Sequence, residues 1–179
     1  MLAHDAAHQL GLERVLLIPV GEAPHREVEP EPGAGVRLEM VERAAEGDEL
    51  LEASGVEVER EGPSYTFRTL ELLREKRPGD EVTLLMGADV AASLAEWKEP
   101  ERVLELARVG VAARPGTDLD EAETVLERLG AHDGFDVVRM PELSVSSTRV
   151  RRRVASGRSI RYLVPDAVSE LVEERGLYR

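Results

Sequence analysis

The sequence predicts an α/β fold, with a mostly parallel sheet and helices on both of its faces. Short apolar runs alternate with amphipathic stretches along the chain. The runs at 15–20 and 82–86 (VLLIPV and VTLLM) are continuously apolar, which is typical of strands buried on both faces. The length of 179 residues suits one domain over 1–179, and 42% hydrophobic residues are enough for a core. In such sheets ligands bind beyond the carboxyl ends of the strands.

The elements of the first half follow from apolar spacing and from helix and strand breakers. An apolar stretch that ends at Pro-Val-Gly predicts a strand, and apolar residues at helical spacing predict helices. The expected elements are a strand over 15–20, a helix over 37–45, a weak strand over 50–58, a helix over 65–76 and a strand over 82–86. A Gly-Ala-Asp segment, 87–89, follows the last of these strands directly.

The second half continues the alternation. Pro100 opens a helix, because proline is favoured in the first turn, and Arg-Pro-Gly at 114–116 stops the next strand. Ser146 or Ser147 caps a later helix. The expected elements are a helix over 100–106, a strand over 109–113, a helix over 120–129, a strand over 136–140, a helix to about 155, and a last helix from 165 that Gly176 ends.

Composition excludes several classes of protein. There is no cysteine, so disulfides, thiolate metal sites and cysteine nucleophiles are excluded, as fits a reducing compartment. No apolar run is long enough to span a bilayer, and the N-terminus shows no secretion signal, so we expect a cytoplasmic protein without a membrane partner. The net charge of −13 disfavours broad nucleic-acid binding.

A cluster of hydroxyls and arginine at one predicted helix start indicates an anion site. Ser146, Ser147 and Thr148 combine hydroxyls with free backbone N–H groups, and Arg151 lies one turn further on with its forked donor set. The helix dipole adds positive potential, so the site suits a phosphate. The alternative is that the serines only cap the helix and the neighbouring arginines are solvated.

Three further positions carry candidate site residues. After the strand at 82–86, Gly87 would let a ligand approach the backbone and Asp89 would accept bonds from ribose hydroxyls, or Asp89 only caps a helix. His25 and Arg26 follow the first strand and would face a phosphate, or His25 is an ordinary loop residue. Trp97, the single tryptophan, would stack on a planar ring or serve as a partly buried anchor.

Together, six segments resemble the bacterial nicotinate-nucleotide adenylyltransferases of the Rossmann-like nucleotidyltransferase superfamily. The resemblance covers almost the whole chain, and its motifs occur in the family's order. They are IPVGEAPHR (18–26), SYTFRTLELL (64–73), MGADVAASLAEW (86–97), VAARPG (111–116), VSSTRVR (145–151) and GRSIRYLVPDAVSELVEERGLY (157–178).

The resemblance implies a reaction in which the 5′-phosphate of nicotinate mononucleotide attacks the α-phosphate of ATP, with Mg²⁺ assisting. The products are nicotinate adenine dinucleotide and pyrophosphate, in NAD biosynthesis. Such a transfer needs positioning and charge neutralisation rather than a protein nucleophile. The implied partners are therefore these two small molecules, with no nucleic acid, and the chain is a possible homo-oligomer.

The resemblance also distributes roles over the candidate residues. By this resemblance, the ATP phosphates would bind Ser146, Ser147, Thr148 and Arg151. His25 and Arg26 match the family's basic pair near these phosphates. Further assignments place the nucleotide ribose hydroxyls at Asp89, with Gly87 beside it in the nucleotide site, the nicotinate pocket at Tyr65, Thr66 and Trp97, and the mononucleotide phosphate at Arg114. Arg151, His25 and Arg26 are the expected catalytic residues, and no metal-ligating residue is expected.

One family signature is absent. The family begins with a strand that leads into a Gly-x-Phe-x-Pro-x-His-x-Gly-His pattern, and aligning Gly11 places Met1 shortly after its second histidine. The absent strand would be central, between the strands at 15–20 and 82–86. We expect either a true start upstream of Met1 or a chain that is impaired, and a chain without this strand to be unstable, rearranged, or to pair those two strands directly.

Three other functions are consistent with parts of this pattern. The missing histidines, with retained phosphate and ring sites, would suit a non-catalytic nucleotide-binding protein, and a nicotinamide-mononucleotide-preferring enzyme is the nearest relative in chemistry. A nucleic-acid binder would use the arginines of the C-terminal region, which are Arg149, Arg151, Arg152, Arg153, Arg158 and Arg161.

Overall fold

The computed structural model describes residues 1–24, 32–131 and 135–179. They form two compact units that interleave along the sequence. The first unit is Met1–Val15 with Ser64–Glu142, and the second is Leu16–Pro63 with Leu143–Arg179.

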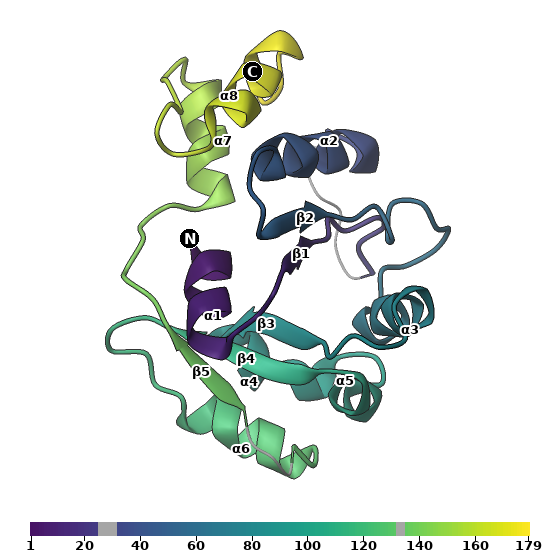
Figure 1. Cartoon of the computed structure of the whole chain (residues 1–179). Coiled ribbons are helices and arrows are strands. Elements are labelled where there is room, and N and C mark those ends of the chain that lie inside the picture. The colour runs from purple at the N-terminus through teal and green to yellow at the C-terminus, as the bar shows by residue number, and fades with distance from the viewer. Residues whose placement is uncertain (25–31, 132–134) are drawn as a thin grey trace. The chain divides into compact units, whose positions relative to one another are not determined.

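The first unit contains a three-stranded parallel sheet in the order β3-β4-β5 (Figure 1). Helices lie on both faces of this sheet, with α1 on one face and α4 and α6 on the other. The elements of the unit are α1 (Leu2–Leu10), α3 (Thr66–Lys76), β3 (Thr83–Gly87), α4 (Ala88–Ala92), the 3₁₀ helix η1 (Leu94–Glu96), α5 (Pro100–Leu106), β4 (Arg108–Ala113), α6 (Asp120–Arg128) and β5 (Asp136–Arg139).

The two faces of the central strand β4 differ in the size of their side chains. Val109 and Val111 are 3% and 0% exposed and join the core that α4, η1 and α6 cover. On the other face a Cβ added to Gly110 would lie 2.7 Å from Leu85 Cδ2 and 3.3 Å from Leu10 Cδ1. Glycine therefore lets α1 pack closely on this face of the sheet.

Helix α1 also holds the edge strand β5. The Gln9 side chain donates from Nε2 to the Arg139 carbonyl at 2.8 Å and accepts from the Arg139 N–H, through Oε1, at 2.9 Å. These two bonds satisfy backbone groups of an edge strand that a further strand would otherwise pair. The carboxyl end of β5 is thus fixed to α1.

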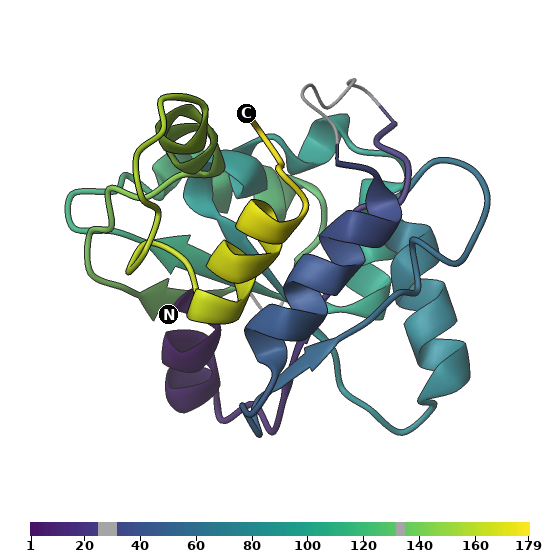
Figure 2. The ribbon, with the colours of Figure 1, turned by 90° about the horizontal axis from the view of Figure 1, so that it is seen from above.

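The second unit contains the two-stranded sheet β1-β2 and three helices. Its elements are β1 (Val15–Leu17, of which Val15 belongs to the first unit), α2 (Ala34–Ala45), β2 (Leu51–Ala53), α7 (Ser147–Ala155) and α8 (Asp166–Glu174). Helices α2 and α8 lie side by side (Figure 2). Arg43 of α2 bridges Glu39 and Glu174 at 3.2 Å each, which joins the two helices.

The predicted alternation of strands and helices is confirmed, with shifted boundaries. The first strand ends at Leu17, before Pro19, which has no N–H to donate to a ladder. The weak strand is reduced to Leu51–Ala53, and helices α4 and η1 were not predicted as elements. Within the described part of the chain β1 pairs with β2 and β3 pairs with β4, so the strands at 15–20 and 82–86 do not pair directly.

Candidate active site

The carboxyl ends of β3 and β4 bring three predicted residues to one edge of the first unit's sheet. Gly87, the last residue of β3, is in register with Ala112 of β4. Asp89 follows Gly87 in α4, and Arg114 directly follows β4. The sheet therefore places Gly87, Asp89 and Arg114 at the edge where parallel α/β sheets bind ligands.

Gly87 is required by the way in which Asp89 folds back over it. A Cβ added to Gly87 would lie 2.6 Å from Asp89 Oδ1, closer than real Cβ contacts allow. Asp89 is exposed and lies in the first turn of α4, but its side chain makes no capping hydrogen bond. The alternative in which Asp89 serves as the helix cap is therefore not what the structure shows, and its carboxylate is available to a ligand.

Arg114 lies at the start of a tight turn. Its backbone N–H donates to Thr117 Oγ1 at 3.0 Å, and its carbonyl accepts from the Thr117 N–H at 3.0 Å. Gly116 takes a φ of 79°, which this turn needs and which favours glycine. The Arg114 side chain is exposed, and no described residue pairs with its guanidinium. The turn thus fixes the backbone and leaves the charge accessible.

Tyr65 and Thr66 lie at the start of α3, and Tyr65 is held by both its backbone and its ring. The Tyr65 carbonyl accepts from the N–H groups of Arg68 at 3.1 Å and Thr69 at 3.2 Å. Its ring stacks on Phe67, with centroids 6.2 Å apart and planes inclined by 24°. Phe67 in turn packs on a buried cluster between α3 and α5. Phe67 belongs to the apolar spacing that predicts the helix over 65–76, and that spacing gives no signal for stacking on Tyr65.

An ion pair between α3 and α5 supports this arrangement. Arg102 of α5 donates to Glu71 of α3 at 3.3 Å and to Glu105 at 2.7 Å. Hydrogen bonds to Glu105 and Glu71 raise the pKa of Arg102 above its ordinary value, because the two carboxylates stabilise the charged guanidinium.

Trp97 combines a packed ring with a partly exposed surface. It follows η1, its N–H donates to the Leu94 carbonyl at 3.0 Å, and the side chain packs against the cluster that contains Leu94, which is fully buried. The residue as a whole is half-buried. The structure thus shows a partly buried anchor, and the role of Trp97 in stacking on a ring stays a prediction.

In the second unit, the start of α7 has the predicted cap. Ser146 is the N-cap, and its Oγ accepts from the Arg149 N–H at 3.2 Å. Ser147 and Thr148 open the helix, and their N–H groups have no acceptor within it. All three residues are exposed. The structure thus shows the capping role, together with two free amides at a positive helix end.

The arginines of α7 divide into two kinds. Arg149 and Arg153 donate to backbone carbonyls, of Ser144 at 2.8 Å and of Ser159 at 2.9 and 3.0 Å. No residue that the structure describes pairs with the guanidinium of Arg151, which is half-buried one turn into the helix. Arg152 beside it is exposed and likewise has no partner among the described residues, so Arg151 and Arg152 are the arginines of this helix that are available to an anion.

Two predicted site residues lie outside the part of the chain that the structure describes. His25 and Arg26 fall within 25–31, outside the described residues. A pocket of about 490 Å³ between α4 and α6, lined by residues such as Glu96, Asp120 and Arg128, contains none of the predicted site residues. In the described ranges no group of three or more His, Cys, Asp or Glu side chains could hold a metal ion, and no helix has the length and apolar character needed to cross a membrane.

Comparison with known proteins defines the class first. The cytidylyltransferase-like family matches residues 1–153, which include the three-stranded sheet and most of α7. Two solved structures share the fold over almost the whole chain. The Plasmodium falciparum nicotinic acid mononucleotide adenylyltransferase complexed with APC superposes with a TM-score of 0.71 at 15% identity, covering 99% of this chain and 88% of that one. For a putative nicotinate-nucleotide adenylyltransferase from Vibrio parahaemolyticus the TM-score is 0.60 at 22% identity, with coverages of 99% and 87%.

Sequence relatives narrow the class. A probable nicotinate-nucleotide adenylyltransferase of Rubrobacter xylanophilus is 39% identical over 180 residues, which is 100% of this chain and 84% of the relative. A protein of the same name in Thermus thermophilus is 39% identical over 179 residues, 100% of this chain and 90% of the relative. The chain belongs to the nicotinate-nucleotide adenylyltransferase family. The family predicted from the six segments is thereby confirmed, as is the Rossmann-like α/β fold.

Proposed function

We propose that this chain transfers the adenylyl group of ATP to nicotinate mononucleotide, in NAD biosynthesis. The observation that carries the proposal is the similarity to nicotinate-nucleotide adenylyltransferases along the full chain, at 39% identity. An oxygen of the mononucleotide 5′-phosphate forms a bond to the α-phosphorus of ATP. The bond from that phosphorus to the bridging oxygen of the β-phosphate breaks, and pyrophosphate leaves with the electron pair. The reaction takes place in the cytoplasm, as the sequence predicts.

The chain supplies position and charge to this reaction rather than a nucleophile. In our proposal the ATP phosphates bind the hydroxyls of Ser146, Ser147 and Thr148 and the two free amides of the α7 start. Arg151 neutralises charge that develops on the α-phosphate and on the departing pyrophosphate. Support comes from the exposed cap and from the guanidinium for which no described partner exists.

In our proposal, residues of the first unit recognise nicotinate mononucleotide and the nucleotide ribose. Asp89 accepts hydrogen bonds from ribose hydroxyls. Because Gly87 has no side chain, it leaves the space that the Asp89 carboxylate occupies. Trp97 stacks on the pyridine ring, and Tyr65 and Thr66 complete the nicotinate pocket. Arg114 pairs with the mononucleotide phosphate. The half-buried Trp97 and the stacked Tyr65 support these roles, because a ring site needs planar side chains that are already held in place.

Two further components complete the proposal. His25 and Arg26 act as a basic pair toward the phosphates. Mg²⁺ would be held by the ATP phosphates and water rather than by protein ligands, and it would neutralise negative charge on the phosphates. This fits the described residues, since they include no cluster of acids or histidines that could form a protein cage.

The test is pyrophosphate release from MgATP and nicotinate mononucleotide. It is run on the chain that begins at Met1 and on the chain extended by any in-frame upstream coding sequence, with nicotinamide mononucleotide as the competing substrate. We expect release with the acid mononucleotide in preference to the amide. Tight binding of both nucleotides without release in either protein would overturn the enzyme and favour a nucleotide-binding protein.

A further inference from the structure

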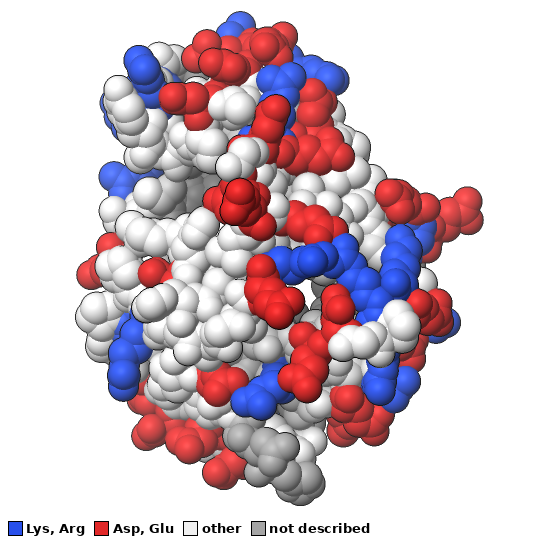
Figure 3. Space-filling model, viewed as in Figure 1, with Lys and Arg blue, Asp and Glu red and all other residues white. Residues whose placement is uncertain are grey.

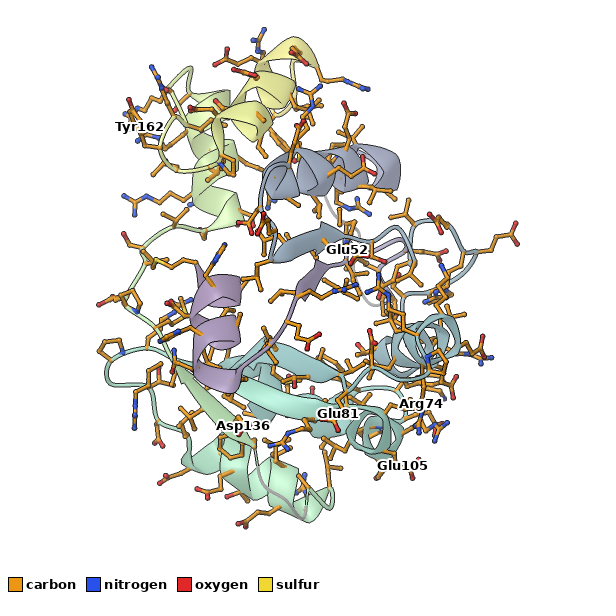
Figure 4. The ribbon with its side chains drawn as sticks, viewed as in Figure 1. Glu52, Arg74, Glu81, Glu105, Asp136 and Tyr162 are labelled. Carbon is orange, nitrogen blue, oxygen red and sulfur yellow. The ribbon has the colours of Figure 1, made fainter. Side chains whose placement is uncertain are left out.

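We propose that Tyr162 and the arginines beside it form a second nucleotide contact, apart from the residues assigned above. The base of a nucleotide stacks on the exposed ring of Tyr162, and the phosphate of the same nucleotide pairs with Arg158 and Arg161. The surface lies on the loop between α7 and α8. Figure 4 shows Tyr162 on the outer side of this loop.

The loop is built to hold its shape. Arg153 donates from Nε and Nη2 to the Ser159 carbonyl, at 3.0 and 2.9 Å, which ties the loop to α7. Ile160 is 3% exposed and anchors the loop in the interior. A turn bond runs from the Leu163 N–H to the Ile160 carbonyl at 3.0 Å. Tyr162 is therefore presented by a fixed backbone.

Tyr162 occupies a position that stability alone assigns to glycine. Its φ is 65°, in the left-handed region where an L side chain is strained, and its side chain is 85% exposed, so burial does not offset the strain. Tyr178 has a similar φ of 59°, but it is half-buried and engaged with other residues. A strained and exposed aromatic residue on a fixed loop indicates a ligand contact.

The charges around Tyr162 specify the kind of ligand. Residues 147–163 contain six arginines and no acidic residue, in a chain whose net charge is −13. The Arg161 guanidinium lies 5.1 Å from the Tyr162 ring centroid and 3.9 Å from the exposed Asp166 carboxylate. Arg158 is exposed, and no residue that the structure describes pairs with its guanidinium. In Figure 3, Lys and Arg side chains border α7 and the loop after it, while acidic side chains gather over α8.

An open aromatic face flanked by guanidinium groups binds a ring that carries a phosphate. A nucleotide has both parts, whereas an acidic peptide offers the charge without a ring for the free face of Tyr162. We therefore assign the surface to a free nucleotide.

The experiment titrates ATP into isotopically labelled chain and follows the amide resonances of residues 158–163. The Arg151→Ala background is used so that the α7 start does not dominate binding. We expect these resonances to shift in a saturable way. Tyr162→Phe keeps the ring and should keep the shifts, whereas Tyr162→Gly should weaken the binding that they report by about tenfold or more.

Thermal unfolding separates loss of the ring from loss of the fold. Tyr162→Gly removes strain, so its Tm should not fall below that of the Tyr162→Phe protein. Resonances that do not respond to ATP, or equal binding by the glycine and phenylalanine variants, would overturn the inference. A short single-stranded oligonucleotide that shifts them when ATP does not would also overturn it. None of these measurements depends on turnover, so they are independent of the adenylyl transfer.

Discussion

Two regions with proposed binding roles are held in opposite ways: the residues of the first unit that we propose bind the pyridine ring, and the helix start of the second unit that we propose binds phosphate. Trp97 and Tyr65 are half-buried and fixed by apolar contacts, to the cluster with Leu94 and to Phe67. The start of α7 is exposed, none of the residues of α7 is buried, and it is shaped by a cap and by free amides. The difference suits the ligands that we propose, because a ring is recognised by shape whereas a phosphate is recognised by donors and charge.

This contrast predicts that substitutions in the two regions affect different substrates. Damage to the packed region should raise KM for nicotinate mononucleotide and lower stability together. Substitutions at the α7 start should raise KM for ATP and, apart from about 1 kcal/mol for loss of the Ser146 cap, leave the free energy of unfolding almost unchanged, because little is buried there.

Arg151→Ala should lower kcat/KM for ATP by roughly 100- to 1,000-fold, the loss expected when one charge-stabilising donor of a transition state is removed. Arg152→Ala is the matched control, since Arg152 neighbours it on α7, is exposed, and has no assigned role. Steady-state kinetics with each substrate varied in turn provide the measurement. Equal losses in the two variants would mean that α7 acts through general positive charge.

Trp97→Ala should raise KM for nicotinate mononucleotide by roughly 10- to 100-fold through loss of stacking, with little change in KM for ATP. It should also lower the free energy of unfolding by about 2 kcal/mol, less than for a fully buried tryptophan, because the residue is half-buried. Denaturant unfolding and kinetics on the same samples measure both effects. Trp97→Phe retains a stacking ring and should recover most of the affinity. If Trp97→Ala lowers the free energy of unfolding but leaves KM for nicotinate mononucleotide unchanged, Trp97 only packs against the core and does not bind the substrate.

Gly87→Ala should reduce kcat/KM by about tenfold, because the new Cβ would lie 2.6 Å from Asp89 Oδ1 and must displace that carboxylate. Gly79→Ala is the control, since a Cβ there would meet nothing within 4 Å. Asp89→Ala supplies the second half of a double-mutant cycle. If Gly87 acts through Asp89, adding Gly87→Ala to Asp89→Ala should cost nothing further. Additive losses would show that Gly87 has a separate role, such as close approach of the ligand.

Sequence patterns located most elements where local chemistry decides them. Pro100 begins α5 as predicted, because its missing N–H is tolerated in the first turn, and Ser146 caps α7. Helix α4 and η1 are too short for apolar spacing to show. The strand-end position of Gly87 and Asp89 was also predicted, since it depends only on where an apolar run stops.

Contacts between side chains could not be read from these patterns. The stacking of Tyr65 on Phe67 and the approach of the Asp89 carboxylate to Gly87 depend on side-chain rotamers. The two bonds from Gln9 to Arg139 join residues 130 positions apart, and neither residue belongs to a motif. Such contacts need the strand register and helix packing, which apolar spacing along the chain does not specify.

Ser146 gives the smallest effect and tests the exposed region most directly, because its hydroxyl caps α7 and is also assigned to a phosphate. Ser146→Ala should lower helix stability by about 1 kcal/mol and raise KM for ATP about threefold, the size of one neutral hydrogen bond. Ser146→Asn separates the roles, since asparagine caps as well as serine but places an amide where the hydroxyl was. If Asn restores the melting temperature but not the KM for ATP, the hydroxyl contacts the phosphate. If it restores both, Ser146 only shapes the helix, and phosphate binding at α7 falls to the amides of Ser147 and Thr148 together with Arg151.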